Sequence, residues 1–341
     1  MANPIIAAMI RPIARRHNAK KMIIDTPNGI QEGRFVTIGG IPQWITIRGR
    51  DRHNPVLLLV HGGPGSSYIP FNPWLLEWEK HFTIVQWDQR GAGKTFQKNG
   101  ANGSGVITLD VLAKDGLELT KHLCRYLNQE KLVLMGSSVG SLIGLLMIRQ
   151  QPDLFWAYVG TEQNTSDHHL ATYQLAKEAA KINNDRKGIS MLKAMGDSPA
   201  AWTQEQVLTI DKLAIKNSKN VPDMIYDLML PALMYSPDYT MNDIKAAQKS
   251  MEFVGGQLFK ELMSFDLSAV GYEFKVPFFI FQGEGDIITP ATNAKAYFDQ
   301  VKAPHKEFAL IKNAGHLAEF ANPDQFLKEL LERVVPVISK R

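Results

Sequence analysis

The feature that most constrains the fold is an apolar strand that leads into a glycine-flanked serine and then directly into an apolar helix. The pattern Gly136-x-Ser138-x-Gly140 is typical of a sharp strand-to-helix turn, which has no room for large side chains two residues before and after the serine. Such a turn exposes the serine hydroxyl and aims the next backbone N–H, that of Val139, at the position of a developing oxyanion. The sequence therefore predicts that Ser138 is a nucleophile.

Apolar runs alternate with helical spacing along much of the chain. Strands are predicted within 33–60, where three open the sheet, and at 82–87, 131–136, 157–161, 276–281 and 306–311. Helices are predicted at 72–80, 109–127, 292–301 and 323–338, with Thr108 as the cap of the second. Strands that alternate with helices predict an α/β fold, in which a mostly parallel sheet carries helices on both faces.

The pattern changes between residues 162 and 269. Apolar residues there recur at helical spacing without an intervening apolar strand, at 170–182, 189–195, 205–216, 223–234 and 241–263. We interpret this block as a helical cap inserted between two strands of the sheet. The expected domains are an N-terminal arm at 1–32, a core formed by 33–161 and 270–341, and a cap at 162–269.

A serine hydroxyl is a poor nucleophile at neutral pH, so Ser138 needs a base, and the base needs an acid that orients it. His316 follows the last predicted strand, and Asp286 follows the strand that ends near residue 281. The chain order serine, aspartate, histidine is that of the α/β-hydrolase arrangement. We therefore expect Ser138, Asp286 and His316 to form a catalytic triad.

The loop after the third strand, His61-Gly-Gly-Pro-Gly65, lets the main chain approach a substrate closely. The backbone N–H of Gly63 is our candidate for the second oxyanion donor beside Val139, with Gly62 as the alternative. His61 and Gly62 are also candidate substrate contacts.

Glu162 follows the strand that ends at residue 161. It is therefore a candidate for binding a substrate ammonium or for replacing the triad acid. The alternative is a solvated loop glutamate.

Five motifs together resemble the proline iminopeptidase-like branch of the α/β-hydrolase superfamily: 61–65, 88–93 (Asp-Gln-Arg-Gly-Ala-Gly), 136–140, 283–286 and 315–316. The match covers roughly 33–161 and 270–340. The resemblance implies a sheet of about eight strands, a helical cap, an acyl-enzyme mechanism and no cofactor. It also implies the triad Ser138, Asp286 and His316, with Gly63 and Val139 as oxyanion donors.

Two positions depart from that branch. Members that cleave N-terminal proline usually carry tryptophan directly after the serine, where this chain has Val139, and a Trp-Glu pair in the cap, where this chain has none. The expected activity is aminopeptidase-like cleavage of a short peptide or aminoacyl amide. An esterase or lactonase acting on a small apolar metabolite is the alternative, and a noncatalytic ligand-binding protein on this fold is a more distant one.

Composition and residue spacing argue against nucleic-acid-binding and metal-binding proteins. The net charge of +4 is spread along 341 residues, which argues against nucleic-acid binding, and histidines at metal-ligand spacing are absent. The single cysteine precludes an intrachain disulfide and favours a reducing compartment, so we expect a cytoplasmic protein.

An apolar run near the N-terminus is followed by five basic residues, an order opposite to that of a secretory signal. This arm could pack on the fold, on a second copy of the chain or on a membrane surface.

Overall fold

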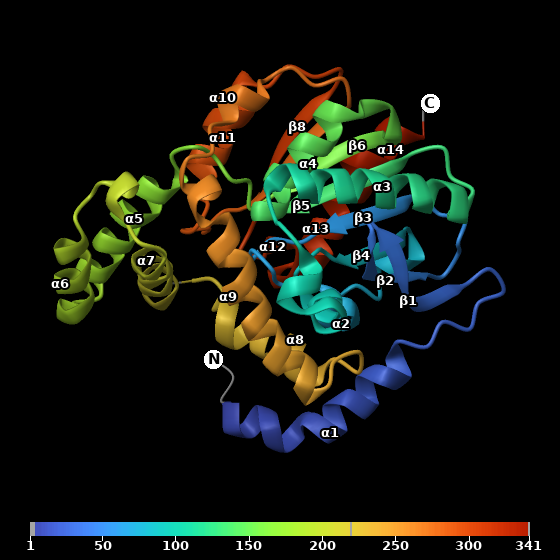
Figure 1. The fold of residues 1–341 in the computed structure, drawn as a ribbon, viewed down its shortest axis with the longest axis horizontal. Helices are drawn as coiled ribbons and strands as arrows, with labels where there is room; N and C mark the ends of the chain where they lie inside the picture. Colours follow the sequence, from blue (N-terminus) through green and yellow to red (C-terminus); the bar gives the residue numbers. More distant parts are fainter. Residues whose placement is uncertain (1–3, 219, 340–341) are drawn as a thin grey trace.

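One mixed sheet of eight strands runs through the structure, a computed structural model that describes residues 4–218 and 220–339. The strand order is β1-β2-β4-β3-β5-β6-β7-β8; β2 is antiparallel to β1 and β4, and the other neighbours are parallel (Figure 1). This confirms the predicted sheet. The strands are β1 (Ile30–Ile38), β2 (Ile41–Gly49), β3 (Val56–Val60), β4 (Thr83–Asp88), β5 (Leu132–Ser137), β6 (Phe155–Thr161), β7 (Phe278–Gly283) and β8 (Lys306–Ile311).

Both faces of the sheet are buried, as a mostly parallel sheet requires. Alternate residues of β3 show this, because Leu58 packs into one apolar cluster and Leu57 and Leu59 into the other. One cluster lies beneath α3 (Leu109–Leu127), α4 (Val139–Gln150) and α11 (Ala291–Gln300). The other lies beneath η1 (Ile69–Trp74), η2 (Trp78–Lys80), α12 (Ala318–Ala321), α13 (Pro323–Glu329), η6 (Leu330–Val334) and α14 (Val335–Ile338).

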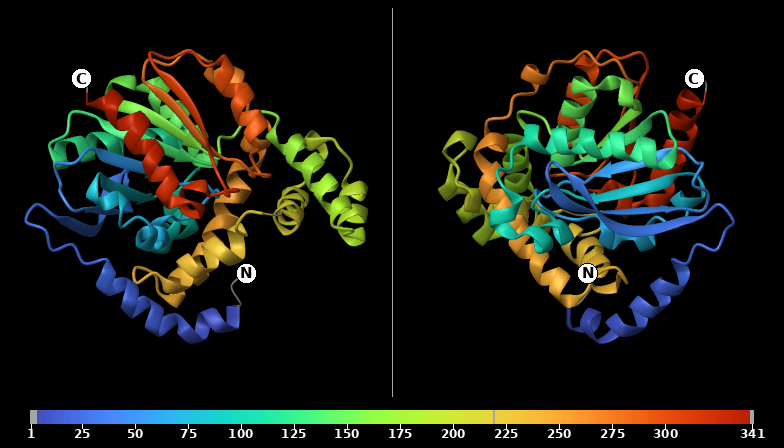
Figure 2. Two further views of the ribbon diagram at one scale, coloured as in Figure 1. Left: turned by 180° about the vertical axis from the view of Figure 1, so that it is seen from behind. Right: turned by 45° about the vertical axis from the view of Figure 1, so that its right-hand side comes forward.

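Between β6 and β7 the described residues form the helical insert, which has two parts. The first part has its own apolar core, which includes Tyr173, Trp202 and Leu213, and it projects from the side of the molecule (Figures 1 and 2). In the second part, Leu228 and Leu258 join the two clusters of the sheet. The helices are α5 (His168–Ile182), α6 (Arg186–Met195), η4 (Pro199–Ala201) and α7 (Gln204–Asn217), then η5 (Met224–Met229), α8 (Leu230–Tyr235), α9 (Met241–Met263) and α10 (Leu267–Val270).

One local prediction is wrong, and one helix was missed. The predicted helix at 72–80 is replaced by the short 3₁₀ turns η1 and η2, and Pro73 inside this segment lacks the N–H group that a regular helix needs. The segment after the glycine loop at 88–93 forms α2 (Gly93–Ser104), which is kinked at Gly100 and was not predicted. Thr108 does cap α3, since its hydroxyl accepts a hydrogen bond from the Val111 N–H. The short helix η3 (Pro152–Leu154) links α4 to β6.

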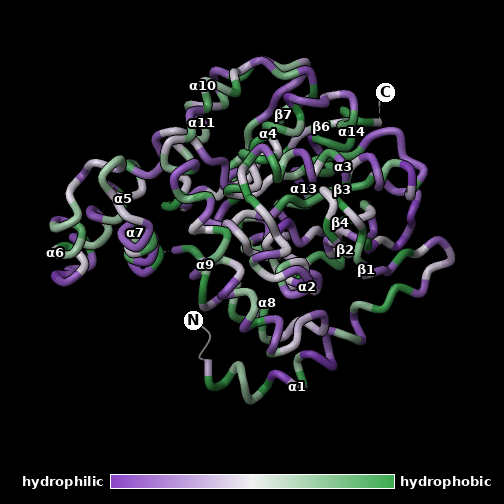
Figure 3. The backbone as a smooth tube through the Cα atoms, in the orientation of Figure 1, coloured by the Kyte–Doolittle hydropathy of each residue, from purple (hydrophilic) through white to green (hydrophobic). Residues whose placement is uncertain are grey.

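The N-terminal arm forms α1 (Pro4–Lys21), which lies along the outside of the insert (Figure 2). Hydrophobic and hydrophilic stretches alternate along it (Figure 3). None of the helices in the described residues is both long and apolar enough to cross a membrane. Residues 1–3 of the predicted arm and residues 340–341 of the predicted core lie outside the described residues.

Candidate active site

The predicted serine turn lies between β5 and α4. Ser138 has φ 54° and ψ −125°, a conformation that is rare for residues with a side chain, and it directly precedes the first residue of α4. A Cβ atom on Gly140 would overlap the carbonyl oxygen of Val60, so this position requires glycine. The turn therefore holds Ser138 at the carboxyl end of the central strands β3 and β5.

His316 lies between Ser138 and Asp286. Its Nε2 atom is 3.2 Å from Ser138 Oγ, and its Nδ1 atom is 3.0 Å from Asp286 Oδ2. The three side chains come from the segments after β5, β7 and β8, which end at the same edge of the sheet. The structure thus brings together, in hydrogen-bonding order, the three residues that the sequence singled out.

The carboxylate of Asp286 is held on several sides. Its Oδ1 accepts from the backbone N–H groups of Ile288 and Thr289 at 2.9 and 3.0 Å. Its Oδ2 accepts from the Thr289 hydroxyl at 2.7 Å and the Gln282 amide at 3.1 Å. Burial alone would raise the pKa of Asp286, but His316 and these hydrogen bonds hold it below its ordinary value. Asp286 therefore remains ionised and orients the imidazole.

His316 is surrounded by negative charge. Its side chain is only 9% exposed, which disfavours the imidazolium. Asp286, Glu162 and Asp211 outweigh that effect and raise the pKa of His316 to about 9. The surroundings therefore stabilise the cation that forms when an imidazole takes a proton from a serine.

The glycine loop after β3 passes directly over Ser138. A Cβ atom on Gly62 would lie 2.6 Å from the Cβ atom of Ser138, so only glycine allows this approach. Gly63 is the next residue in the loop, with φ 120°. Val139 is the first residue of α4, and the first N–H groups of a helix have no partner within the helix. Both predicted oxyanion donors therefore adjoin the serine turn.

His61 is buried beneath this loop. Its Nδ1 atom is 2.9 Å from the carbonyl oxygen of Gly62, and its Nε2 atom accepts from the Gln89 N–H at 3.3 Å. The Gln89 side-chain amide donates to the His61 carbonyl at 2.8 Å. Burial lowers the pKa of His61 to about 4, so the ring is neutral at physiological pH. His61 therefore links the glycine loop to the loop after β4.

Glu162 is fully buried, so its interpretation as a solvated loop residue is wrong. Its Oε1 accepts from the backbone N–H of Ala318 at 2.8 Å and from the Thr161 hydroxyl at 2.7 Å. Its Oε2 accepts from the Ser137 hydroxyl at 2.5 Å. Because Ala318 is two residues after His316, Glu162 ties the histidine loop to the strand that carries the serine.

A second buried carboxyl, that of Glu319, lies against Glu162. Among the described residues, neither of its oxygens has a hydrogen-bond partner of good geometry. Burial and the neighbouring Glu162 charge raise the pKa of Glu319 well above its ordinary value. Burial beside Glu162 therefore favours the neutral, protonated form of Glu319 over its carboxylate. The Tyr68 hydroxyl continues the network, 2.8 Å from the hydroxyl of Ser137.

The insert contributes a charge that the sequence analysis missed. Asp211 lies half-buried on α7. Burial raises the pKa of Asp211 to about 7; the Asp286 charge adds to this rise, and the His316 charge opposes it. The helical spacing of 205–216 predicted the helix, but not which of its polar residues faces the triad. Glu319 was missed for the same reason, since a glutamate after a loop histidine carries no signal of burial.

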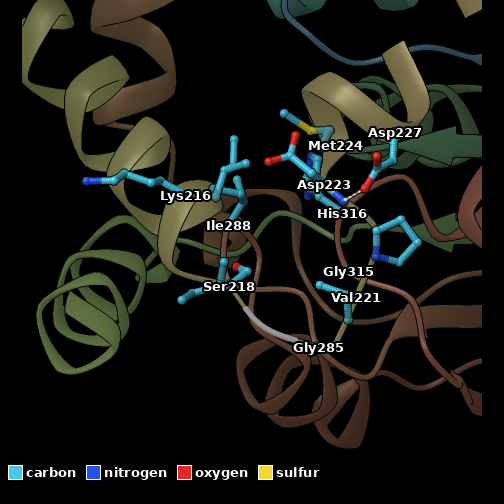
Figure 4. A pocket seen from close by; sticks show the side chains of 13 residues that line it. Lys216, Ser218, Val221, Asp223, Met224, Asp227, Gly285, Ile288, Gly315 and His316 are labelled. Atoms are coloured by element: carbon cyan, nitrogen blue, oxygen red, sulfur yellow. Dashed lines mark hydrogen bonds between the residues drawn. The ribbon is translucent and has the colours of Figure 1, made fainter. Parts of the chain in front are cut away.

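A cavity of about 90 Å³ lies between the insert and the sheet beside His316 (Figure 4). The end of α7, η5 and the loops after β7 and β8 form its walls. Its apolar lining includes Ile215, Val221, Met224 and Ile288. Within the described residues, no group of three or more histidine, cysteine, aspartate or glutamate side chains is arranged to hold a metal ion.

The family model of the alpha/beta hydrolase fold matches residues 55–323, which contain the strands β3 to β8 and the insert. The chain belongs to the α/β-hydrolase family. Among the relatives of this α/β hydrolase is the probable aminopeptidase YbaC of Bacillus subtilis, which is 29% identical over 86% of this chain and 93% of the relative. A proline iminopeptidase of Lacticaseibacillus rhamnosus is 24% identical over 80% and 87% of the two chains.

Solved structures agree on the fold of this α/β hydrolase. The proline iminopeptidase-related protein from Thermus thermophilus superposes with a TM-score of 0.61 at 18% identity, covering 91% of this chain and 99% of that chain. The proline iminopeptidase of Mycobacterium smegmatis gives a TM-score of 0.58 at 14% identity, covering 91% and 99%. The resemblance stated from the sequence motifs is therefore confirmed.

Proposed function

We propose that this α/β hydrolase is a serine aminopeptidase that releases the N-terminal residue of a short peptide or aminoacyl amide. The observation that carries the proposal is the position of His316, within hydrogen-bonding distance of both Ser138 and Asp286. The relatives named aminopeptidase and proline iminopeptidase support the substrate class.

In the proposed mechanism, Ser138 Oγ attacks the scissile carbonyl carbon while His316 Nε2 takes the hydroxyl proton. Asp286 stabilises the resulting imidazolium through Nδ1. The backbone N–H groups of Val139 and Gly63 would stabilise the oxyanion of the tetrahedral intermediate. His316 then protonates the leaving amine as the C–N bond breaks, which leaves an acyl-enzyme. Water attacks this ester, with His316 again as base, and releases the acid and free Ser138.

Asp211 supports a substrate with a free amine. An N-terminal ammonium bound near the triad needs a negative charge, and the carboxyl of Asp211, whose pKa burial raises to about 7, interacts electrostatically with His316 and Asp286 from the insert. Glu162 does not suit this role, because its two oxygens are fully buried and already accept hydrogen bonds from the protein. We therefore assign ammonium binding to Asp211 and positioning of the His316 loop to Glu162.

An esterase or lactonase is the second candidate. The apolar side chains in the lining of the cavity beside His316, such as Val221 and Met224, favour a small apolar acyl group. Val139 provides no large aromatic surface beside the serine. Ester hydrolysis would use the same triad and the same oxyanion donors. Only the contacts that the insert makes with the substrate would differ.

A fluorophosphonate probe tests the nucleophile. The wild-type protein should be labelled at Ser138, and Ser138→Ala should not be labelled. Ser137→Ala is the matched control for the neighbouring hydroxyl and should keep labelling at Ser138. Absence of labelling in the folded wild-type protein, or equal labelling of Ser138→Ala, would refute the hydrolase mechanism and would favour a noncatalytic ligand-binding protein.

A substrate panel separates the two candidates. Aminoacyl amides with free amines should be cleaved with a higher kcat/KM than their N-acetylated analogues. Asp211→Asn should raise KM about tenfold or more for the free amines, because a hydrogen bond to a charged group contributes roughly 1.5–3 kcal/mol. It should leave KM for simple acyl esters nearly unchanged, since its effect on the pKa of His316 acts on kcat and not on ester binding. If N-acetylation has no effect on the wild-type enzyme, the esterase candidate replaces the aminopeptidase.

A further inference from the structure

The helix α1 is amphipathic, but its apolar side faces outward. Large apolar side chains that are between 41% and 74% exposed recur at helical spacing along its first half: Ile5, Ile6, Met9, Ile10 and Ile13. A helix that packs on its own fold normally turns such a stripe inward, where burial of apolar area stabilises the protein. Here the stripe is exposed, on a helix that lies at the edge of the molecule (Figure 1).

Small and polar residues attach α1 to the insert. The guanidinium of Arg11 donates to the carbonyl of Tyr239 at 3.0 Å. Arg15 donates to the carbonyls of Ser236 and Pro237 at 3.0 and 2.9 Å. These acceptors lie at and just beyond the carboxyl end of α8, where unpaired carbonyls and the helix dipole attract cations. Polar contacts therefore fix the orientation of α1, with its apolar stripe pointing away.

Exposed cations continue the outer stripe. Arg16 follows Ile13 by three residues and Lys20 follows Arg16 by four, so they lie on the same side of the helix, and Lys21 adjoins them. All three are exposed. The sequence of α1 contains no aspartate or glutamate. The outer side of α1 is thus apolar in its first half and positively charged in its second half.

We propose that the outer side of α1 is an interfacial helix that binds the surface of an anionic lipid bilayer. Apolar residues on one face of a helix enter the boundary between headgroups and acyl chains, while arginine and lysine remain beside the phosphates. Positive charge near an anionic membrane adds to the affinity and falls off with ionic strength.

A second copy of the chain fits this surface less well. In a parallel pairing of two α1 helices, Arg16 and Lys20 would face the same cations of the partner copy. In an antiparallel pairing, they would lose water against isoleucine and methionine, because α1 has no acidic residue to pair with them. An anionic lipid surface complements both halves of the helix at once.

Sedimentation with large unilamellar vesicles tests the proposal on the full chain. The protein should bind vesicles of phosphatidylcholine with 30% phosphatidylserine and bind pure phosphatidylcholine at least tenfold more weakly. Affinity for the mixed vesicles should fall on going from 50 to 300 mM salt. The triple variant Arg16→Gln, Lys20→Gln, Lys21→Gln should lose about fivefold in affinity per cation removed, or about a hundredfold in total.

The apolar half has its own variant and a matched control. The triple variant Ile6→Ser, Met9→Ser, Ile13→Ser should lose binding to the mixed vesicles. The control Val106→Ser, Ile182→Ser, Leu208→Ser removes three similarly exposed apolar side chains elsewhere and should bind as wild type does. Both variants should keep the thermal unfolding midpoint and the fluorophosphonate labelling of the wild type, since none of these residues belongs to the triad.

Three results would overturn the proposal. The first is the absence of binding to the mixed vesicles at 50 mM salt. The second is equal binding by wild type and the Ile6, Met9, Ile13 variant. The third is a wild-type dimer in light scattering that the same variant converts to a monomer without any loss of lipid binding, because α1 would then be an interface between copies of the chain. None of these results depends on whether the protein is a hydrolase.

Discussion

The loops after β6 and β7 each bring a buried carboxylate close to His316, but the two carboxylates differ in their partners. Asp286, in the loop after β7, accepts from the imidazole, from two backbone N–H groups and from a hydroxyl and an amide. Glu162, directly after β6, accepts from two hydroxyls and one N–H and lies against Glu319. The pKa of Asp286 is lowered, whereas burial raises the pKa of Glu162.

This difference shows that burial does not decide the role of a carboxylate. Both side chains have lost nearly all contact with solvent, and both act electrostatically on His316. Only Asp286 touches the imidazole, so only Asp286 can fix its tautomer. Glu162 acts on the backbone two residues further on and supplies charge at longer range. We therefore expect substitutions at the two positions to have different sizes and different signatures.

Asp286→Asn should have the largest effect. An asparagine amide would donate to Nδ1 or leave it unpaired, so the imidazole would take the wrong tautomer and the imidazolium would lose its partner. We expect kcat to fall about 10⁴-fold, with a small change in KM. Steady-state kinetics measures this, and the unfolding midpoint monitors the fold. A loss below tenfold would mean that Glu162 can replace Asp286 as the triad acid.

The pH profile of fluorophosphonate labelling tests the shared effect of the two carboxylates. Because His316 acts as a base only when neutral and its pKa is raised to about 9, labelling should accelerate with pH up to about 9. The rate should rise about tenfold per pH unit well below that midpoint and level off near it, hence about fiftyfold from pH 7 to 9. A rate that is constant between pH 6 and 8 would contradict the raised pKa.

Glu162→Gln should have an intermediate effect. The substitution keeps the shape of the side chain but removes its charge and one acceptor, so the His316 loop would shift slightly and the imidazolium would lose stabilisation. We expect labelling at its optimal pH to slow about tenfold, within the range caused by small displacements of a catalytic group. The midpoint of the pH profile should also move to lower pH. An unchanged midpoint would limit Glu162 to a structural role.

Glu319→Gln is the matched control and should have the smallest effect on the rate, within about twofold of wild type. Its effect should appear in stability instead. The folded state holds a proton on Glu319 that the unfolded chain releases above about pH 4.5, so wild-type stability falls as the pH rises from there towards the raised folded pKa. In Glu319→Gln, the free energy of unfolding should decrease less with pH than in the wild type, by up to about 1.4 kcal/mol per pH unit. Parallel pH-stability curves for the two proteins would show that Glu319 is ionised in the folded state.

The sequence by itself determined the fold class and singled out Ser138, Asp286 and His316, which the structure brings together. Strong local constraints made this possible. The spacing of Gly136 and Gly140 around Ser138 indicates a sharp strand-to-helix turn. The positions of Asp286 and His316 after predicted strands place both at one edge of a parallel sheet. Their catalytic roles, and those of Gly63 and Val139, stay predictions until the labelling and kinetic experiments are done.

Only the tertiary structure decided how the other polar residues are used. Glu162 and Glu319 pack against each other beneath the serine turn, although 157 positions separate them in the chain. Asp211 acts electrostatically on His316 from a helix whose apolar spacing does not reveal which of its polar residues does so. In α1, Arg11 and Arg15 face the protein while the isoleucines face outward, because the carbonyls at the end of α8 provide acceptors that the α1 sequence does not reveal. Local sequence specifies turns and strand ends, whereas burial and charge environment depend on which distant segments pack together.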